Sequence, residues 1–142
     1  MKYLKIIAPV IFLLMMNCAA QNTPKGFDTI TYKAQTRGSL IQITVEGSKL
    51  LYKSNEVEGK KEVSKEQLEE LKKVVSELNL EEIANLKAPS EKRIIDGALH
   101  AEFTVKIADK EYRSSTFDAG NPPKELKKLE EFLYNLSDLN EE

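Results

Sequence analysis

Apolar and polar residues alternate in the first part of the chain, and this pattern predicts β-strands. The alternation runs through residues 30–34 and 41–45, and a period of two is typical of strands with one buried face. Residues 50–54 predict a third strand, and residues 60–63 predict a short fourth strand with a charged edge. Turn sequences separate these strands: Arg37-Gly38-Ser39, Glu46-Gly47-Ser48 and residues 55–59.

The pattern then changes to the period of a helix. Ser64 and Gln67 fit a capping box, in which the two side chains satisfy free N–H groups of the first turn. Residues 80–86 predict one or two further helical turns, and Pro89 ends them. The apolar positions of the main helix form one stripe: Leu68, Leu71, Val74, Val75 and Leu78.

Two further strands and a second helix follow. Residues 99–107 alternate without interruption, a turn follows at Asp109-Lys110, and residues 112–117 return as the next strand. Asn121 and Pro122 predict the start of the second helix, with asparagine as the cap and proline in the first position. Its apolar stripe is Leu126, Leu129, Phe132, Leu133 and Leu136.

The order of these elements, ββββ-α-ββ-α, predicts an α+β fold. Short connections favour antiparallel pairing, and each helix must bury its apolar stripe. We therefore expect one antiparallel sheet of five to six strands with both helices packed on one face. The polar positions of the strands then line the open face, which is the candidate surface for binding a partner: Gln42, Thr44, His100, Glu102, Thr104 and Lys106.

The N-terminus has the pattern of an export signal. Lys2 and Lys5 precede an apolar run at residues 6–16, which is too short to span a bilayer of about 30 Å. The run ends near Cys18, the only cysteine, which has no partner for an internal disulfide. The segment resembles a bacterial lipoprotein signal, and this resemblance implies lipidation of Cys18. The alternatives are an ordinary signal cleaved after Ala19 or Ala20 and an uncleaved anchor.

These observations divide the chain into four parts. Residues 1–17 form the signal, residues 18–26 a flexible tether, residues 27–138 one domain and residues 139–142 an acidic tail. The chain has 21 basic and 23 acidic residues, and without Lys2 and Lys5 the basic residues number 19. The charges are interspersed, so no basic patch predicts nucleic-acid binding.

The chain carries no motif that predicts catalysis. His100 is the only histidine, and neither Ser114 nor Ser115 lies in a nucleophile motif. Asp96-Gly97 and residues 118–121 lack the spacing of a calcium loop, and turn chemistry explains them. Carboxylate pairs on the helices, such as Glu130-Glu131, indicate a solvated face. We expect a non-enzymatic protein with no catalytic residue, metal or cofactor.

Three segments resemble emfourins, small inhibitors of thermolysin-like metallopeptidases. They are the strand–turn–strand of residues 30–45 with Gly38, Asp96-Gly97 with the strand through Phe103, and residues 122–129 at the final helix. The resemblance spans about residues 30–136 and implies the α+β fold and a protein-binding role. It carries no inhibitory residue over to this chain.

Two hypotheses of function remain open. The first is a membrane-anchored, protein-binding lipoprotein of the cell envelope, with inhibition of a protease as one form of that role. The alternative is a structural or assembly lipoprotein without inhibitory activity. In both, the N-terminal lipid binds the membrane and an envelope protein is the partner. Residues 19–26 lack the acidic residues that follow the cysteine in some surface-exported lipoproteins, so the resemblance implies a periplasm-facing position.

We predict that Cys18→Ser releases or mislocalises the protein. Two or more acyl chains anchor a protein stably, and the substitution removes the acceptor thiol. Metabolic labelling with a fatty-acid probe and fractionation of membranes measure this effect. Equal labelling of the wild-type chain and the variant would contradict lipidation at Cys18.

Overall fold

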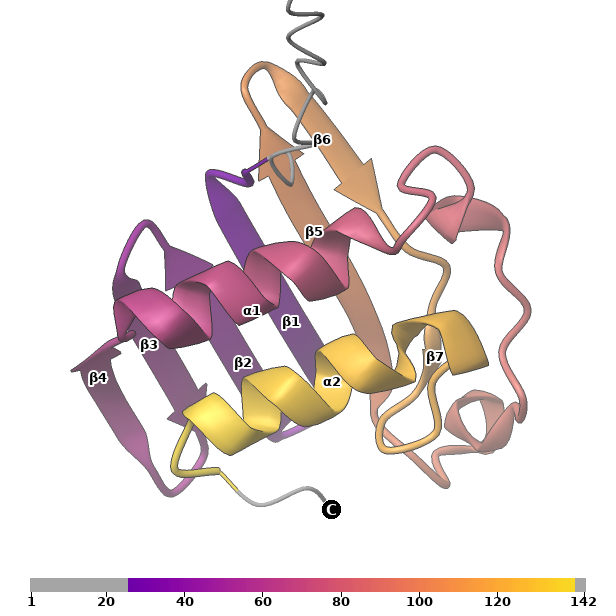
Figure 1. Cartoon of the computed structure of the whole chain (residues 1–142). Helices are drawn as coiled ribbons and strands as arrows, with labels where there is room; N and C mark the ends of the chain where they lie inside the picture. The colour runs from indigo at the N-terminus through magenta and orange to yellow at the C-terminus, as the bar shows by residue number, and fades with distance from the viewer. Residues whose placement is uncertain (1–25, 140–142) are drawn as a thin grey trace, which may run out of the picture.

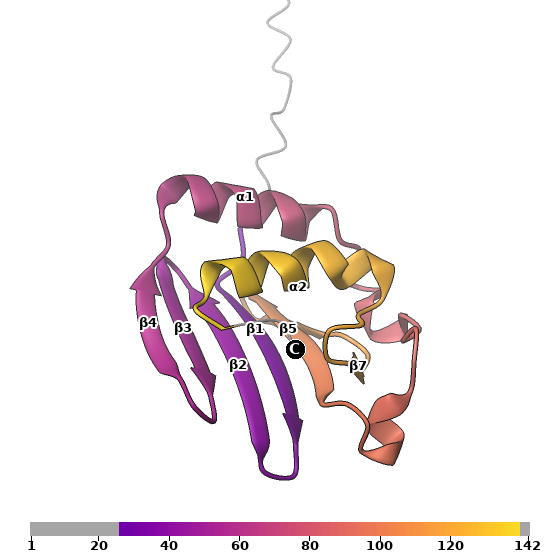
Figure 2. The same ribbon diagram turned by 90° about the horizontal axis from the view of Figure 1, so that it is seen from below.

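The computed structural model describes residues 26–139, which form two layers (Figures 1 and 2). One layer is an antiparallel sheet with the strand order β4-β3-β2-β1-β5-β6, and β7 pairs with β5. Both long helices lie on the same side of this sheet. The α+β fold and the order of its elements are therefore confirmed. The elements are β1 (Thr29–Thr36), β2 (Ser39–Glu46), β3 (Lys49–Ser54), β4 (Glu58–Glu62), α1 (Lys65–Ser76), η1 (Ile83–Asn85), η2 (Lys92–Ile95), β5 (His100–Ile107), β6 (Lys110–Arg113), β7 (Phe117–Asp118) and α2 (Lys124–Leu136).

The buried apolar positions of the strands face the helices, whereas Leu51 of β3 pairs with Thr44 and is exposed. Tyr32 and Phe103 pair across β1 and β5, are fully buried, and have ring centroids 5.1 Å apart. Phe117 stacks on Phe103 at 5.9 Å, so aromatic rings fill the centre of the core. The other buried strand residues are Ile30, Ala34, Ile41, Ile43, Val45, Leu50, Tyr52, Ala101 and Val105.

Helix α1 begins as its sequence predicts. Ser64 Oγ accepts from the Gln67 N–H at 3.2 Å, and Gln67 Oε1 accepts from the Ser64 N–H at 3.0 Å. This capping box is confirmed, and it satisfies two N–H groups that the helix itself leaves free. Leu71, Val74 and Val75 are buried against the sheet.

Helix α2 begins later than expected, so the predicted cap at Asn121 is wrong. Pro123 occupies the cap position, and the helix starts at Lys124. Asn121 instead donates its N–H to Asp118 O at 2.9 Å, and its side-chain amide donates to Ser90 Oγ at 2.7 Å. The asparagine thus closes a turn and contacts a distant loop, which local capping preferences do not reveal.

The burial of Glu130 also differs from expectation. Its side chain is fully buried, whereas the Glu130-Glu131 pair had indicated a solvated face. Glu130 Oε1 accepts from the Gly120 N–H at 3.3 Å, and Tyr32 and Tyr134 lie nearby with ring centroids 5.4 Å apart. Burial, together with the negative charge of Glu130, raises the pKa of Tyr32 well above its ordinary value. Phe132, expected in the core, is only half-buried.

A break at Ser114 divides the last predicted strand, residues 112–117, into β6 and β7. Ser114 is buried, its N–H donates to Phe103 O, and its Oγ accepts from the Phe103 N–H, both at 2.9 Å. At Ser115 the N–H donates to Ile83 O at 3.0 Å and Oγ donates to Leu86 O at 2.6 Å. Both serines therefore bind backbone groups, and Ser115 holds the segment containing η1 beside the sheet.

We predict that Phe103→Ala strongly lowers the thermal unfolding midpoint. Phe103 is fully buried between two rings, and truncation of a buried phenylalanine costs about 3–5 kcal/mol. Lys106→Ala is the matched control on the exposed side of the same strand and should change the midpoint little. Similar midpoints for the two variants would show that the faces of β5 are wrongly assigned.

Candidate functional site

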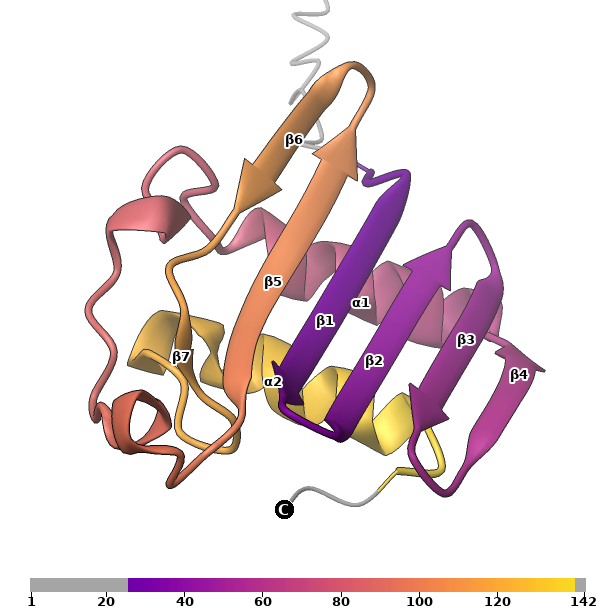
Figure 3. The ribbon, with the colours of Figure 1, turned by 180° about the vertical axis from the view of Figure 1, so that it is seen from behind.

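The predicted binding residues lie together on the face of the sheet that the helices leave uncovered (Figure 3). Thr31 of β1 pairs with Thr44 on one side and with Thr104 on the other. Lys33, two residues further along, pairs with Gln42 and Glu102 in the same way. The strand register thus aligns residues from β2, β1 and β5 into rows across this face, which we call the open face.

The middle row of the open face is uncharged. Thr31 Oγ1 and Thr44 Oγ1 are 3.3 Å apart, and Gln42 Nε2, from the neighbouring row, donates to Thr44 Oγ1 at 3.5 Å. These hydroxyl and amide groups are half-buried and lie close to one another across the strands. This part of the open face therefore presents small polar groups that contact one another.

Several charges at one border of the open face already have partners. Glu102 pairs with Arg113 at 3.5 Å, and Lys106 pairs with Glu111 at 3.5 Å. Exposed pairs of this kind contribute about 0–1 kcal/mol. By contrast, neither Lys33 nor Arg37 has an ion pair with the described residues. The two unpaired cations are the stronger candidates for contact with a partner.

A depression of about 540 Å³ brings these cations together at one end of the open face. It lies where β1 ends and β5 begins, and His100 lies within it. Amide, hydroxyl, cationic and carboxylate groups all face this space, which suits polar groups of a protein surface. The sequence analysis identified His100 and Glu102 but missed the rest of the lining: Lys33, Gln35, Thr36, Arg37, Asp96 and Thr116.

Asp118 fixes the loop that borders this depression. Its side chain is 2% exposed and lies opposite His100 in the pairing of β7 with β5. It accepts from Ser90 Oγ at 2.5 Å and from the N–H groups of Lys92 and Arg93 at 2.8 and 3.0 Å. The Arg93 guanidinium adds a fourth contact at 3.1 Å. The segment containing η2 is therefore held over a buried carboxylate.

The surroundings of Asp118 keep it charged. Burial alone would raise its pKa, because burial disfavours the ionised form. The hydrogen bonds from Ser90, from the backbone of Arg93 and Lys92, and from the Arg93 side chain outweigh that effect. They hold the pKa of Asp118 well below its ordinary value. Hydrogen-bond donors occupy both carboxylate oxygens of Asp118. The turn at residues 118–121, which the sequence analysis explained by turn chemistry, therefore also holds the loop before β5 in place.

Neither a metal site nor a membrane-spanning helix is found in residues 26–139. No three His, Cys, Asp or Glu side chains in this range lie close enough together to bind a metal ion. None of the helices within the same range has the length and apolar character needed to cross a bilayer. Cys18 and the expected signal lie outside the described residues.

Comparisons of the chain with protein-family models, with curated proteins and with solved structures find no match. The resemblance to emfourins and to lipoprotein signals therefore stays a prediction. The argument for function rests on the geometry of the open face and of the loop beside it.

We predict that Asp118→Asn lowers the free energy of unfolding at pH 7 by about 2 kcal/mol or more, because charge-assisted hydrogen bonds contribute about 1.5–3 kcal/mol. The folded pKa lies below the unfolded value of about 3.9. Asp118 therefore stabilises the fold fully above that value, and its contribution is lost as the pH falls toward the lower folded pKa.

Urea unfolding at pH 7 and at pH 3 measures this difference. The matched control is Asp109→Asn, at an exposed turn position between β5 and β6. The stability of the Asp118 variant should depend less on acid than that of the wild-type chain. Equal stability of the two variants at pH 7 would contradict the role assigned to Asp118.

Proposed function

We propose that this chain is a membrane-anchored, non-enzymatic lipoprotein of the cell envelope that binds a protein partner through the open face. Inhibition of an exported protease is one form of this role. The observation that carries the proposal is the free sheet face with its depression, where Lys33 and Arg37 have no ion pair within the described residues. Stable protein interfaces bury about 800 Å² per partner and combine polar with apolar contacts.

The N-terminal tether supports the membrane part of the proposal. Cys18 precedes Gly26 by eight residues, and a chain of this length reaches at most about 28 Å. A lipid on Cys18 would keep the domain close to the membrane without any contact from the folded part. The open face would then remain available to other proteins of the envelope.

The chemistry of the hydroxyl and imidazole groups supports a non-enzymatic role. Ser114 and Ser115 donate their hydroxyl protons to backbone carbonyls, so neither is arranged as a nucleophile with a base. The imidazole of His100 is exposed at the end of the open face and has no hydrogen bond to the described residues. Its position suits contact with a partner better than general base catalysis, which requires a second group to orient the ring.

The alternative function is structural: the chain would recruit an envelope protein without inhibiting it. The captured protein distinguishes the two roles. If it is a peptidase whose activity falls on addition of the purified domain, the chain is an inhibitor. If it is a structural protein, or a peptidase whose activity is unchanged, the assembly role holds.

We predict that the double variant Lys33→Glu/Arg37→Glu captures at least about tenfold less partner from detergent-solubilised membranes. Charge reversal places two acidic side chains against any partner surface that is complementary to the two cations. A loss of 1.4 kcal/mol in binding free energy lowers the affinity tenfold. The full-length chain with a C-terminal tag is used as bait, and quantitative mass spectrometry measures the captured protein.

The matched control is Lys65→Glu/Lys73→Glu, which makes the same change in net charge on helix α1. Both residues are exposed on the layer opposite the open face. Thermal unfolding checks that each variant is folded. Equal capture by both double variants, or loss with the helix variant alone, would place the binding surface elsewhere.

A further inference from the structure

Strand β4 lies at one edge of the sheet, and no other strand of residues 26–139 pairs with its outer side (Figure 1). The opposite edge is different, because the segment containing η1 lies beside it and Ile83 O accepts from the Ser115 N–H at 3.0 Å. An uncovered edge strand presents N–H and C=O groups that can pair with another chain. Strand β4 is therefore the part of this sheet that can add a further strand.

The register of β4 on β3 shows which backbone groups face outward. The Val63 N–H donates to Ser48 O at 2.8 Å. At the other end of the pair, the Ser54 N–H donates to Val57 O at 2.6 Å. In an antiparallel pair, residues that exchange such bonds alternate with residues whose N–H and C=O groups point away. The odd-numbered residues of β4 therefore bond to β3, and three residues direct their backbone groups outward: Glu58, Lys60 and Glu62.

The side chains of the outward-directed residues lie on the same side of the sheet as the open face. Lys60 pairs with Leu51, which in turn pairs with Thr44 of the open face. The Glu58 side chain is 3.4 Å from Lys53 but remains 72% exposed, so a second cation can approach it. Lys60 has no ion pair with the described residues. The edge thus carries a negative, a positive and a negative charge at alternate positions.

The charges of β4 permit antiparallel pairing of two copies in one register. A twofold axis through a residue places that residue opposite its own copy. Every residue of β4 except Gly59 is charged, so any other axis places like charges opposite each other, which is destabilising. With the axis at Gly59, Glu58 of each copy lies opposite Lys60 of the other. Glu62 then lies outside the paired segment, because the position opposite it, residue 56, belongs to the turn before β4.

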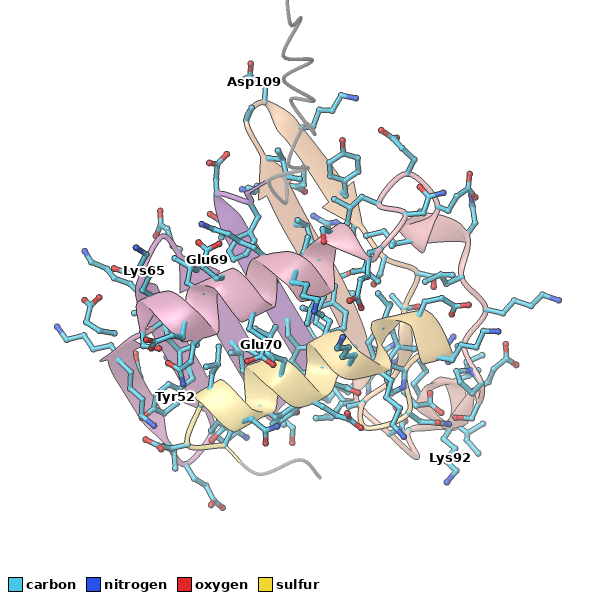
Figure 4. All side chains as sticks on the ribbon, in the orientation of Figure 1. Tyr52, Lys65, Glu69, Glu70, Lys92 and Asp109 are labelled. Atoms are coloured by element: carbon cyan, nitrogen blue, oxygen red, sulfur yellow. The ribbon has the colours of Figure 1, made fainter. Side chains whose placement is uncertain are left out.

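Gly59 also leaves room for close approach of the two strands at this axis. Residues that face each other without exchanging hydrogen bonds lie about 4.5 Å apart between Cα atoms, and glycine adds no side chain there. The other side of this glycine is already occupied, since a Cβ would lie 2.3 Å from Tyr52 Oη. Figure 4 shows Tyr52 at this edge of the domain. Tyr52 donates to Asp138 Oδ2 at 2.5 Å, so contacts within the chain hold the ring there.

We propose that β4 pairs with β4 of a second copy of this chain about a twofold axis at Gly59. Glu58 of each copy and Lys60 of the other exchange main-chain hydrogen bonds and form an ion pair beside them. The axis is perpendicular to the sheet, so the helices of both copies lie on one side and the open faces join on the other. The dimer does not depend on which partner the open face binds.

The same charges make the pairing selective. Short, charged edge strands resist pairing with most other strands. A strand added to β4 must therefore carry a complementary order of charges, and β4 itself carries one. Two strands of five residues form a small interface, and interfaces that bury less than about 1,200 Å² are typical of weak complexes. We therefore expect a dimer that exchanges with the monomer rather than a permanent one.

Sedimentation equilibrium of the full-length chain in detergent, from ~1 to ~200 μM, tests the proposal. We expect the wild-type chain to shift from one copy to two as its concentration rises. Glu58→Lys and Lys60→Glu each place like charges in both pairs and should weaken dimerisation about tenfold or more. An equal mixture of the two variants should dimerise again, because the lysines of one then lie opposite the glutamates of the other.

The matched controls are Glu131→Lys and Lys127→Glu, which reverse the two charges of an exposed ion pair on α2. Each should dimerise as the wild-type chain does, and thermal unfolding checks that all four variants are folded. A wild-type chain that stays monomeric throughout, or β4 variants that dimerise normally, would overturn the proposal. Failure of the mixture to dimerise would equally exclude the register with the axis at Gly59.

The outcome is separate from that of the proposed function. Sedimentation of the purified chain involves no envelope partner, and capture by the Lys33→Glu/Arg37→Glu variant does not involve β4. A monomeric chain that still captures an envelope protein would overturn the dimer alone. A dimer that captures no protein would overturn the binding function alone.

Discussion

Burial of one face of the sheet beneath two amphipathic helices is the constraint on which the rest of this domain depends. The buried apolar residues of the strands lie on one side of the sheet, and the two helical stripes together cover that side. No third apolar layer exists among the described residues that could cover the other side. The open face is therefore a direct consequence of how the core is made, and any partner must meet polar groups there.

Local patterns predicted most of the fold, because its main elements are amphipathic and their turns are short. Alternation assigned the faces of β1, β2 and β5, and the capping box placed the start of α1 at Ser64. The errors at Asn121 and Glu130 have a different origin. Both residues bind groups on other segments, Ser90 and Gly120, and such contacts depend on how the chain folds back on itself.

The candidate site, like the fold, has one part that the sequence predicts and one part that only the structure shows. Alternate residues of a strand lie on opposite faces of a sheet. The sequence was therefore sufficient to place the six predicted open-face residues on one surface. The depression and the exposure of Ile94 and Ile95 were not predicted, because they depend on the packing of the segment containing η2 over Asp118. An exposed Ile94-Ile95 pair and a core pair look alike in a sequence, and only the buried carboxylate beneath the loop distinguishes them.

The pairing of β1 with β5 has a consequence for when the domain can fold. These two central strands lie far apart in the sequence, since Thr29 pairs with Lys106. The core cannot close until β5 has been synthesised, and contacts between distant segments slow folding. A chain that is exported, as we propose for this one, would therefore remain open until its second half is present.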